Sequence, residues 1–201
     1  QGPAWTDQFG RAIRQWSEST LRHPIRTLSL FSGAGGLDIG FHDVGFVITT
    51  MVEIEDRFVE TLRANSGVGK YLAGSMPLCQ DILHFHPDSS QSIDFIIGGP
   101  PCQSFSAAGR RAAGVRGTQD NRGALFEEYV RLLKRLRPRG FLFENVYGIA
   151  GAEQGRAWEK ITSAFQTAGY RIHFRILDAA DFGVPQHRKR VFIIGWNKQF
   201  Y

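Results

Sequence analysis

Short apolar runs alternate with helical stretches along most of this chain, and this alternation restricts the possible folds more than any other feature of the sequence. The runs are rich in β-branched and aromatic residues and occupy residues 26–31, 46–52, 93–98, 140–145, 170–178 and 190–196. Stretches with helical periodicity lie between them at residues 37–44, 55–65, 123–136 and 157–168. Strands that alternate with helices at this spacing form βαβ units. The sequence therefore predicts an α/β fold, with a mostly parallel sheet and helices on both faces.

The last two predicted strands differ from the others because no helix fits between them. The connecting residues 179–189 include Gly183 and Pro185, which are typical of turns. Without a crossover helix, two consecutive strands pair in the antiparallel direction. We therefore expect residues 170–178 and 190–196 to form an antiparallel pair at one edge of the sheet.

The first 25 residues precede the predicted sheet. Within residues 4–22, Phe9, Ile13 and Trp16 recur at helical spacing, which indicates an amphipathic helix. Residues 1–3 resemble the remnant of a protease-cleaved tag, so they are left out of the fold prediction. We expect residues 1–25 to form an N-terminal extension and residues 26–201 to form one domain.

Composition narrows the class of protein further. With 201 residues, of which 42% are hydrophobic and 21% charged, the chain is long enough for one well-packed domain. No run approaches the roughly 18 apolar residues of a membrane span, and the first residues lack an apolar signal region. We therefore expect a cytoplasmic, nucleoid-associated protein with no membrane partner. The net charge of +5 favours an anionic partner such as nucleic acid.

Ligands of open parallel sheets bind at the carboxyl ends of the strands, where the strand order reverses. Four of the six predicted strands run directly into a polar or glycine-rich segment. The first is LFSGAGGLDIGF, residues 30–41, which indicates a strand, a tight glycine turn and the start of a helix. Glycines let the backbone approach a ligand closely, and the first turn of a helix offers free N–H groups.

The glycine spacing of this segment departs from the dinucleotide-binding fingerprint G-x-G-x-x-G, because Asp38 stands where the third glycine is expected. A carboxylate there would repel a pyrophosphate. Glu53 ends the next predicted strand, where a carboxylate can accept hydrogen bonds from both ribose hydroxyls. A nucleoside ligand without a pyrophosphate therefore fits better than NAD, and S-adenosylmethionine is the usual one. A plain tight turn with an exposed acid is the alternative.

The second segment is IIGGPPCQSFS, residues 96–106, which places Cys102 behind two glycines and two prolines. The prolines fix φ and restrict the residues before them to extended shapes, so the cysteine is held out from a strand end on a stiff backbone. Its thiolate would be a good nucleophile. From this segment alone, a nucleophile and a buried cysteine remain equally open. The other cysteine, Cys79, is expected to be a buried small apolar residue.

The third segment, FLFENV, ends an apolar strand with Glu144 and Asn145. A carboxyl group in a partly dry pocket has a raised pKa and can hold a proton for donation near neutral pH. The fourth segment, DFGVPQHRKRVFIIG, carries Arg188 and Arg190 on one face where the last strand begins. Guanidinium groups donate hydrogen bonds to carbonyl or phosphate oxygens. A solvated basic strand end is the alternative interpretation of the two arginines.

Together these segments resemble the DNA (cytosine-5)-methyltransferases. The motifs that carry the resemblance follow the order of that family: LFSGAGGLDIGF, EIED, QDI, GGPPCQSFSAAG, DNRGALFEEYVRLL, RPRGFLFENV and DFGVPQHRKRVFIIG. They cover most of the chain from Thr27 to Gly195. The resemblance implies the Rossmann-like fold of S-adenosylmethionine-dependent methyltransferases, with residues 26–201 as the catalytic and cofactor-binding domain and double-stranded DNA as the substrate. A nicotinamide oxidoreductase is disfavoured by Asp38 and would leave Cys102 without a role.

The resemblance also implies a mechanism. The thiolate of Cys102 would attack C6 of the cytosine and turn the ring into an enamine whose C5 takes the methyl group. Glu144 would protonate N3 and Arg190 would contact the O2 face, which places both groups where negative charge develops. A stacked duplex hides both faces of the C5–C6 bond, so the cytosine must be flipped into the pocket. The implied catalytic residues are Cys102, Glu144, Arg188 and Arg190.

The same resemblance implies a site for S-adenosylmethionine, which leaves as S-adenosylhomocysteine. The adenine would pack on Phe31 beside Ile54 and donate from its amino group to Asp81. The ribose would bind Glu53. The full set of implied cofactor residues is Phe31, Gly33, Ala34, Gly36, Glu53, Ile54, Asp81, Ile82, Gly99, Pro101 and Leu125.

The stretch after Cys102 is long, basic and punctuated by glycines, which predicts a mobile loop that closes over phosphates. In the family this loop is a lid on bound DNA, and a surface loop without that role is the alternative. The residues expected to contact DNA are Gln103, Ser104, Ser106, Arg110, Arg111 and Arg116.

The sequence departs from the family pattern in two ways. It stops at Tyr201, so we expect the target-recognition domain and the last two motifs to be absent, including a Gly-Asn segment that has no copy within residues 4–25. Asp178 also stands where the family commonly has asparagine. We therefore expect the catalytic subunit or fragment of a split or truncated enzyme, completed by a second polypeptide. The alternatives are a subunit that binds cofactor or DNA without turnover, and a methyltransferase that acts on transfer RNA.

Overall fold

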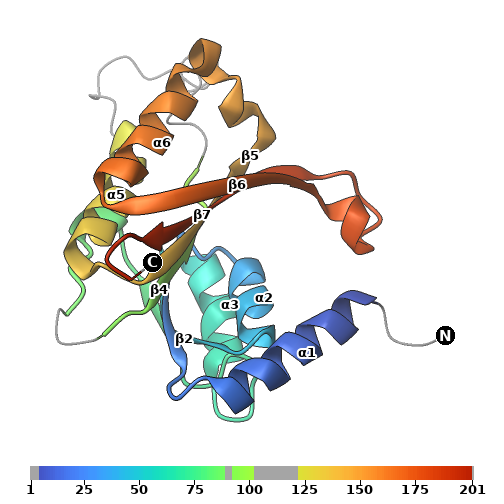
Figure 1. Ribbon diagram of the computed structural model, residues 1–201. Helices are drawn as coiled ribbons and strands as arrows, with labels where there is room; N and C mark the ends of the chain where they lie inside the picture. Colours follow the sequence, from blue (N-terminus) through green and yellow to red (C-terminus); the bar gives the residue numbers. More distant parts are fainter. Residues whose placement is uncertain (1–4, 89–91, 102–121, 201) are drawn as a thin grey trace.

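The computed structural model describes residues 5–88, 92–101 and 122–200, and this part of the chain contains a seven-stranded sheet (Figure 1). The strands follow the spatial order β3-β2-β1-β4-β5-β7-β6. Neighbouring strands from β3 to β5 are parallel, whereas β7 runs antiparallel to both β5 and β6. The strand bounds are β1 (Ile25–Leu30), β2 (Phe46–Glu53), β3 (Met76–Cys79), β4 (Phe95–Gly98), β5 (Gly140–Val146), β6 (Tyr170–Asp178) and β7 (Lys189–Asn197).

Helices alternate with these strands, so the predicted α/β fold and its antiparallel edge pair are confirmed. The prediction missed β3, because its four residues include Pro77, which interrupts most strands. Proline is tolerated there because β3 lies at the edge of the described sheet. The helices are α1 (Trp5–Thr20), α2 (Gly36–Asp43), α3 (Asp56–Ser66), α5 (Arg122–Leu136) and α6 (Arg156–Thr167), with 3-10 turns η1 (Ile82–His84), η3 (Tyr147–Ala150), η4 (Ala152–Gly155) and η5 (Ala179–Phe182).

Aromatic side chains fill the space between the sheet and helices α5 and α6. Phe141 and Phe143 of β5 meet Phe165 of α6 with ring centroids 4.5 and 5.3 Å apart. Tyr129 of α5 is fully buried, and its hydroxyl donates to the carbonyl oxygen of Leu142 at 2.9 Å. This apolar layer fixes the position of β5, which carries one of the predicted site segments.

Helices α2 and α3 cover the opposite face of the sheet (Figure 1). Met51, Phe95 and Ile97 belong to this second cluster of buried side chains, together with Leu62 of α3. The central strands β1, β2, β4 and β5 therefore bury side chains on both faces, as in other doubly wound sheets. The strand order reverses between β1 and β4, and the carboxyl ends of both strands lie at the same edge.

Helix α1 contacts α2 and confirms the predicted N-terminal helix. Arg14 donates from Nε to the carbonyl oxygen of Asp43 at 3.0 Å and from Nη2 to that of His42. These carbonyl groups lie at the C-terminal end of α2, where they have no partner within the helix and attract a cation. The side chains of Phe9 and Trp16 remain exposed on α1.

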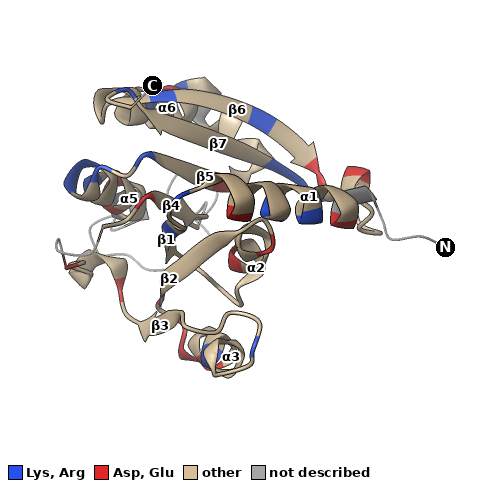
Figure 2. Cartoon of the chain, turned by 60° about the horizontal axis from the view of Figure 1, so that its bottom comes forward, with Lys and Arg blue, Asp and Glu red and all other residues tan. Residues whose placement is uncertain are grey.

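Basic side chains lie along the antiparallel pair β6 and β7 at one side of the sheet. Figure 2 shows blue segments on β6 and β7, which carry Arg171, Arg175, Lys189 and Arg190. Among the residues that the structure describes, no helix combines the length and the apolar character needed to cross a membrane.

Candidate active site

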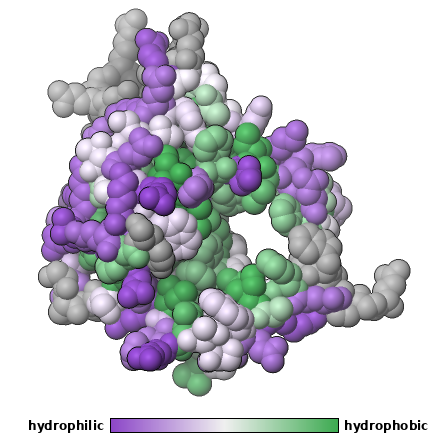
Figure 3. Space-filling model, viewed as in Figure 1, coloured by the Kyte–Doolittle hydropathy of each residue, from purple (hydrophilic) through white to green (hydrophobic). Residues whose placement is uncertain are grey.

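The four sequence segments meet in one cavity of about 520 Å³ at the carboxyl ends of β1, β4 and β5 and the beginning of β7. In Figure 3 the surface is hollowed between the end of the β6–β7 pair and α2, with apolar side chains around the hollow. Six predicted site residues lie in the lining, at the edge of the sheet where a ligand is expected. The lining consists of Phe31, Gly36, Leu37, Gly99, Glu144, Leu177, Ala179, Phe182, Arg188, Arg190 and Phe192.

Glu144 and Arg190 form an ion pair in this cavity. Arg190 Nε lies 3.0 Å from Glu144 Oε1, and the two side chains are 20% and 26% exposed, respectively. Burial raises the pKa of Glu144 above its ordinary value, and the charges of Arg190 and Arg188 offset only part of the rise. The Glu144 carboxyl group can therefore hold a proton closer to neutral pH than an exposed glutamate can, with a guanidinium group beside it.

The two glycines before Cys102 make room for other parts of the chain. A Cβ atom on Gly98 would lie 2.7 Å from the carbonyl oxygen of Leu30, and one on Gly99 would lie 2.6 Å from Glu144 Oε2. Gly98 therefore allows β4 and β1 to approach each other. Gly99 leaves the space that the Glu144 carboxylate occupies, a role that was not predicted from the sequence.

Asn145 holds the segment that leads from β4 toward the predicted nucleophile. Its Nδ2 donates to the carbonyl oxygen of Pro100 at 3.1 Å, and its Oδ1 accepts from the N–H of Val146 at 2.9 Å. Sequence reasoning noted Asn145 only as the neighbour of Glu144. A buried amide at the end of an apolar strand is the signal that could have predicted this hydrogen bond.

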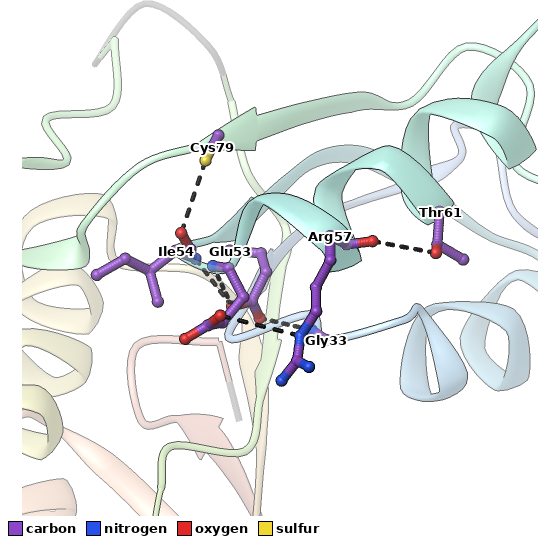
Figure 4. A network of polar contacts seen from close by, with 7 residues as sticks. Gly33, Glu53, Ile54, Arg57, Thr61 and Cys79 are labelled. Carbon is purple, nitrogen blue, oxygen red and sulfur yellow. Dashed lines mark hydrogen bonds and ion pairs between the residues drawn. The ribbon is translucent and has the colours of Figure 1, made fainter.

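Backbone N–H groups hold Glu53 at the predicted ribose site (Figure 4). Glu53 Oε2 accepts from Gly33 N–H at 2.7 Å, and Oε1 accepts from the N–H groups of Ile54 and Glu55 at 2.9 and 3.0 Å. Gly33 reaches this position with φ of 54°, in the left-handed region that favours glycine. The predicted adenine contact Ile54 lies directly after Glu53 and is 60% exposed.

Cys79 corrects one prediction. Its side chain is exposed at the end of the edge strand β3, and Sγ donates to the carbonyl oxygen of Ile54 at 3.6 Å (Figure 4). The expected burial of Cys79 is therefore wrong, because the edge strand leaves its carboxyl end uncovered.

Asp38 is fully buried in the first turn of α2, so the alternative of a plain turn with an exposed acid is wrong about its exposure. Burial raises the pKa of Asp38 to about 6, and the nearby Ser29 hydroxyl offsets part of the rise. Ser29 Oγ itself lies 2.9 Å from Ser32 Oγ. Neither carboxyl oxygen of Asp38 has a hydrogen-bond partner of good geometry among the described residues.

Other predicted cofactor residues lie outside the lining of the cavity. Asp81 caps the turn η1 by accepting from the N–H of residue 83 at 3.0 Å. Ile82 is buried in the core, Leu125 packs partly against it, and Ala34 and Pro101 are exposed. The predicted nucleophile and the predicted DNA contacts lie outside the described residues; they are Cys102, Gln103, Ser104, Ser106, Arg110, Arg111 and Arg116.

Sequence reasoning missed the apolar part of the cavity. Phe192 lies two residues after Arg190, so the two-residue period of the strand was a signal that both share a face. Leu177, Ala179 and Phe182 come from the end of β6 and the turn η5. Nothing local in the sequence shows that this connection folds back over the site.

Comparisons with known proteins identify the family of the chain. The sequence model of the family described as C-5 cytosine-specific DNA methylase matches residues 25–201. Type II methyltransferase M.NgoPII of Neisseria gonorrhoeae is 40% identical over 184 residues, which make up 92% of this chain and 51% of the relative. Type II methyltransferase M.AquIA of a Picosynechococcus species is 43% identical over 180 residues, covering 85% of this chain and 71% of the relative.

A solved structure shares the fold. It is described as a DNA modification methyltransferase encoded within an E. coli prophage, and it matches with a TM-score of 0.70 and 30% identity over 88% of this chain and 47% of that chain. The chain therefore belongs to the C-5 cytosine-specific DNA methylase family. It spans about half the length of M.NgoPII.

Proposed function

We propose that this chain transfers a methyl group from S-adenosylmethionine to C5 of a flipped cytosine in DNA, through a covalent bond between Cys102 and C6. The observation that carries the proposal is the Glu144–Arg190 pair in the cavity. A carboxyl group with a raised pKa inside a cavity is typical of proton transfer. It therefore supports a catalytic chain over a subunit that binds cofactor or DNA without turnover.

The turn after β1 supports S-adenosylmethionine as the methyl donor. A Cβ atom at Gly33 or Gly36 would meet nothing within 4 Å, so open space lies beside this turn for a nucleoside ligand. Glu53 would accept hydrogen bonds from the ribose, and Phe31, which lines the cavity, would contact the adenine. The bound cofactor supplies a methyl group on a positively charged sulfur.

The residues of this chain then have distinct roles on the cytosine. The Cys102 thiolate forms a bond to C6, and the proton of Glu144 moves to N3. Arg190 donates to O2, where negative charge develops. After C5 has taken the methyl group, a base removes the C5 proton, the bond between Sγ and C6 breaks, and N3 returns its proton to Glu144.

A second polypeptide would complete the enzyme. The chain spans about half of M.NgoPII and 71% of M.AquIA, so both relatives contain residues beyond the part that matches this chain. Base recognition requires contacts to base edges in the grooves of DNA. We propose that the second polypeptide supplies these contacts.

The test combines the chain with the polypeptide encoded beside it and measures transfer of a labelled methyl group to duplex DNA. Cys102→Ser is expected to lower the rate by at least about a thousandfold, because a hydroxyl is a far weaker nucleophile than a thiolate. Cys79→Ser is the matched control, because Cys79 is exposed and lies on β3, away from the cavity lining.

Activity that survives Cys102→Ser would contradict the proposed nucleophile. Competition between duplex DNA and transfer RNA in the same assay distinguishes the two polynucleotide substrates. Cofactor binding without methyl transfer by the complete assembly would support the binding subunit instead.

A further inference from the structure

The buried carboxylate of Asp178 forms hydrogen bonds across the connection between β6 and β7. Asp178 Oδ1 accepts from the backbone N–H groups of Arg188 at 2.8 Å and Ala180 at 3.3 Å, and Oδ2 lies 3.1 Å from Nδ1 of His187. The side chain of Asp178 is 10% exposed, whereas that of His187 is 90% exposed. Asp178 therefore ties the turn η5 to the residues that lead into β7.

Asp178 is the acceptor in all three hydrogen bonds. Burial alone would raise the pKa of Asp178, but the hydrogen bonds from Arg188, His187 and Ala180 outweigh burial and hold this pKa below its usual value. An ionised carboxylate has no hydrogen to donate. Nδ1 of His187 therefore carries the hydrogen of the bond that joins the two side chains.

Asparagine, which the family commonly has at this position, would behave differently. Its single oxygen could still accept from the N–H of Arg188, but its amide group would donate, so the side chain at residue 187 would have to accept. Asp178 and a donating His187 thus form a matched pair in this chain.

The backbone of Arg188 connects the hydrogen bonds of Asp178 with the cavity. Its N–H donates to Asp178, and its carbonyl oxygen accepts from the N–H of Ala179 at 3.1 Å, so Arg188 is attached on both sides to the far end of the connection. Arg188 and Arg190 alternate with Lys189 and therefore share a face, and both line the cavity that contains Glu144. We therefore expect a shift of the Arg188 backbone to reorient the guanidinium groups of both Arg188 and Arg190.

We propose that Asp178, together with His187, is a positioning residue that holds Arg188 and Arg190 against Glu144. Asp178 acts through the backbone of Arg188 and does not contact the reacting atoms. Its effect on catalysis rests on the proposed function, whereas its effect on the backbone does not.

Amide hydrogen exchange of the chain, followed by NMR, tests the backbone effect. Asp178→Ala removes all three acceptor contacts and is expected to speed exchange of the Arg188 amide by about tenfold or more. Asp181→Asn is the matched control, because Asp181 is an exposed carboxylate on the same turn η5. Unchanged exchange at Arg188 in Asp178→Ala, or an equal increase in Asp181→Asn, would overturn the proposal.

Asp178→Asn provides a second variant if Asp178→Ala does not fold. Its remaining oxygen is expected to keep most of the protection at the Arg188 amide, while the ring nitrogen signals of His187 shift because Nδ1 loses its acceptor. Ring signals identical to those of the wild type would show that His187 is not held by Asp178.

Methyl transfer by the complete assembly tests the effect on catalysis. Asp178→Ala is expected to lower kcat about tenfold with little change in the KM for S-adenosylmethionine, and Asp178→Asn should restore most of kcat. A kcat unchanged by Asp178→Ala would contradict the positioning role. If the wild-type assembly transfers no methyl group, the proposed function fails, and the exchange experiment still decides whether Asp178 fixes Arg188.

Discussion

Glu53 ends β2 and Glu144 lies near the end of the parallel strand β5 at the same edge of the sheet, yet their surroundings differ. Glu53 accepts three hydrogen bonds from backbone N–H groups. Glu144 lies beside a guanidinium group, and burial raises its pKa. Fixed donors keep a carboxylate ready to accept further hydrogen bonds, whereas a raised pKa lets a carboxyl group hold a proton. This difference in environment supports the proposed binding role for Glu53 and the proposed proton-transfer role for Glu144.

After their proposed roles, we name the surroundings of Glu53 the cofactor half of the site and those of Glu144 the catalytic half. The cofactor half contains Gly33, Asp38 and Glu53, and the catalytic half contains Gly99, Glu144 and Arg190. If the two halves have separate roles, substitutions in one should change cofactor affinity or stability, and substitutions in the other should change kcat.

Glu144→Gln should have the largest effect. The amide cannot give a proton to N3, so kcat of the complete assembly is expected to fall by about a thousandfold. The Kd for S-adenosylmethionine should remain within about twofold of the wild-type value, because the cofactor half is untouched. An equally large loss of cofactor affinity would show that the two halves are not separate.

Asp38→Asn should stabilise the fold at neutral pH. The pKa of Asp38 is about 6 in the folded chain against an ordinary value of 3.8, so the folded state binds more protons between these values and stability falls as pH rises through this window. Above this pH window, the free energy of unfolding is lower by about 3 kcal/mol. An uncharged asparagine avoids this loss. Urea unfolding of the wild type and Asp38→Asn at about pH 7.5 and about pH 4 measures the difference in their free energies of unfolding. A gain of the same size at both pH values would mean that charge is not its cause.

Glu53→Gln should weaken cofactor binding by about tenfold, because the amide group turns a donor toward backbone N–H groups that need an acceptor. At saturating cofactor, kcat should change little. Glu55→Gln is the matched control, since the Glu55 side chain is 58% exposed and pairs only with exposed Arg57 among the salt bridges of the described chain. Titration calorimetry of the complete assembly provides the Kd, and equal effects of both substitutions would contradict the role of Glu53.

Gly99→Ala should have the smallest effect, a fall in kcat of about fivefold. The new Cβ atom would lie 2.6 Å from Glu144 Oε2, so the flexible end of the carboxylate must move away from its position. Gly148→Ala is the control, because a Cβ atom there meets nothing within 4 Å. Equal kcat for both variants would show that the Glu144 carboxylate tolerates displacement.

The sequence predicted the elements and the strand ends well because both depend on local patterns. The alternation of apolar runs predicted every described strand except β3. That strand has four residues and contains a proline, which is rare within strands. Burial of individual side chains was less predictable. Asp38 is covered and Cys79 is exposed because of the strands and helices around them, which are distant in the sequence.

Contacts between segments of the site were also beyond local reasoning. The sequence placed Gly99, Glu144 and Arg190 at three strand ends, but only the sheet order shows that Gly99 faces the Glu144 carboxylate and that Arg190 pairs with it. Asp178 was recognised only as a departure from the family pattern. Its hydrogen bonds to residues 180, 187 and 188 depend on how the connection between β6 and β7 folds back.

Covalent trapping on duplex DNA that carries 5-fluorocytosine tests the central claim most directly. Fluorine at C5 cannot leave as a proton does, so the bond between the nucleophile and C6 persists after methyl transfer. With the second polypeptide and S-adenosylmethionine present, we predict a single adduct on Cys102, identified by peptide mass spectrometry. The adduct should be absent in Cys102→Ser and retained in Cys79→Ser. Methyl transfer by the same assembly without an adduct on Cys102, or an adduct on another residue, would contradict the proposed mechanism.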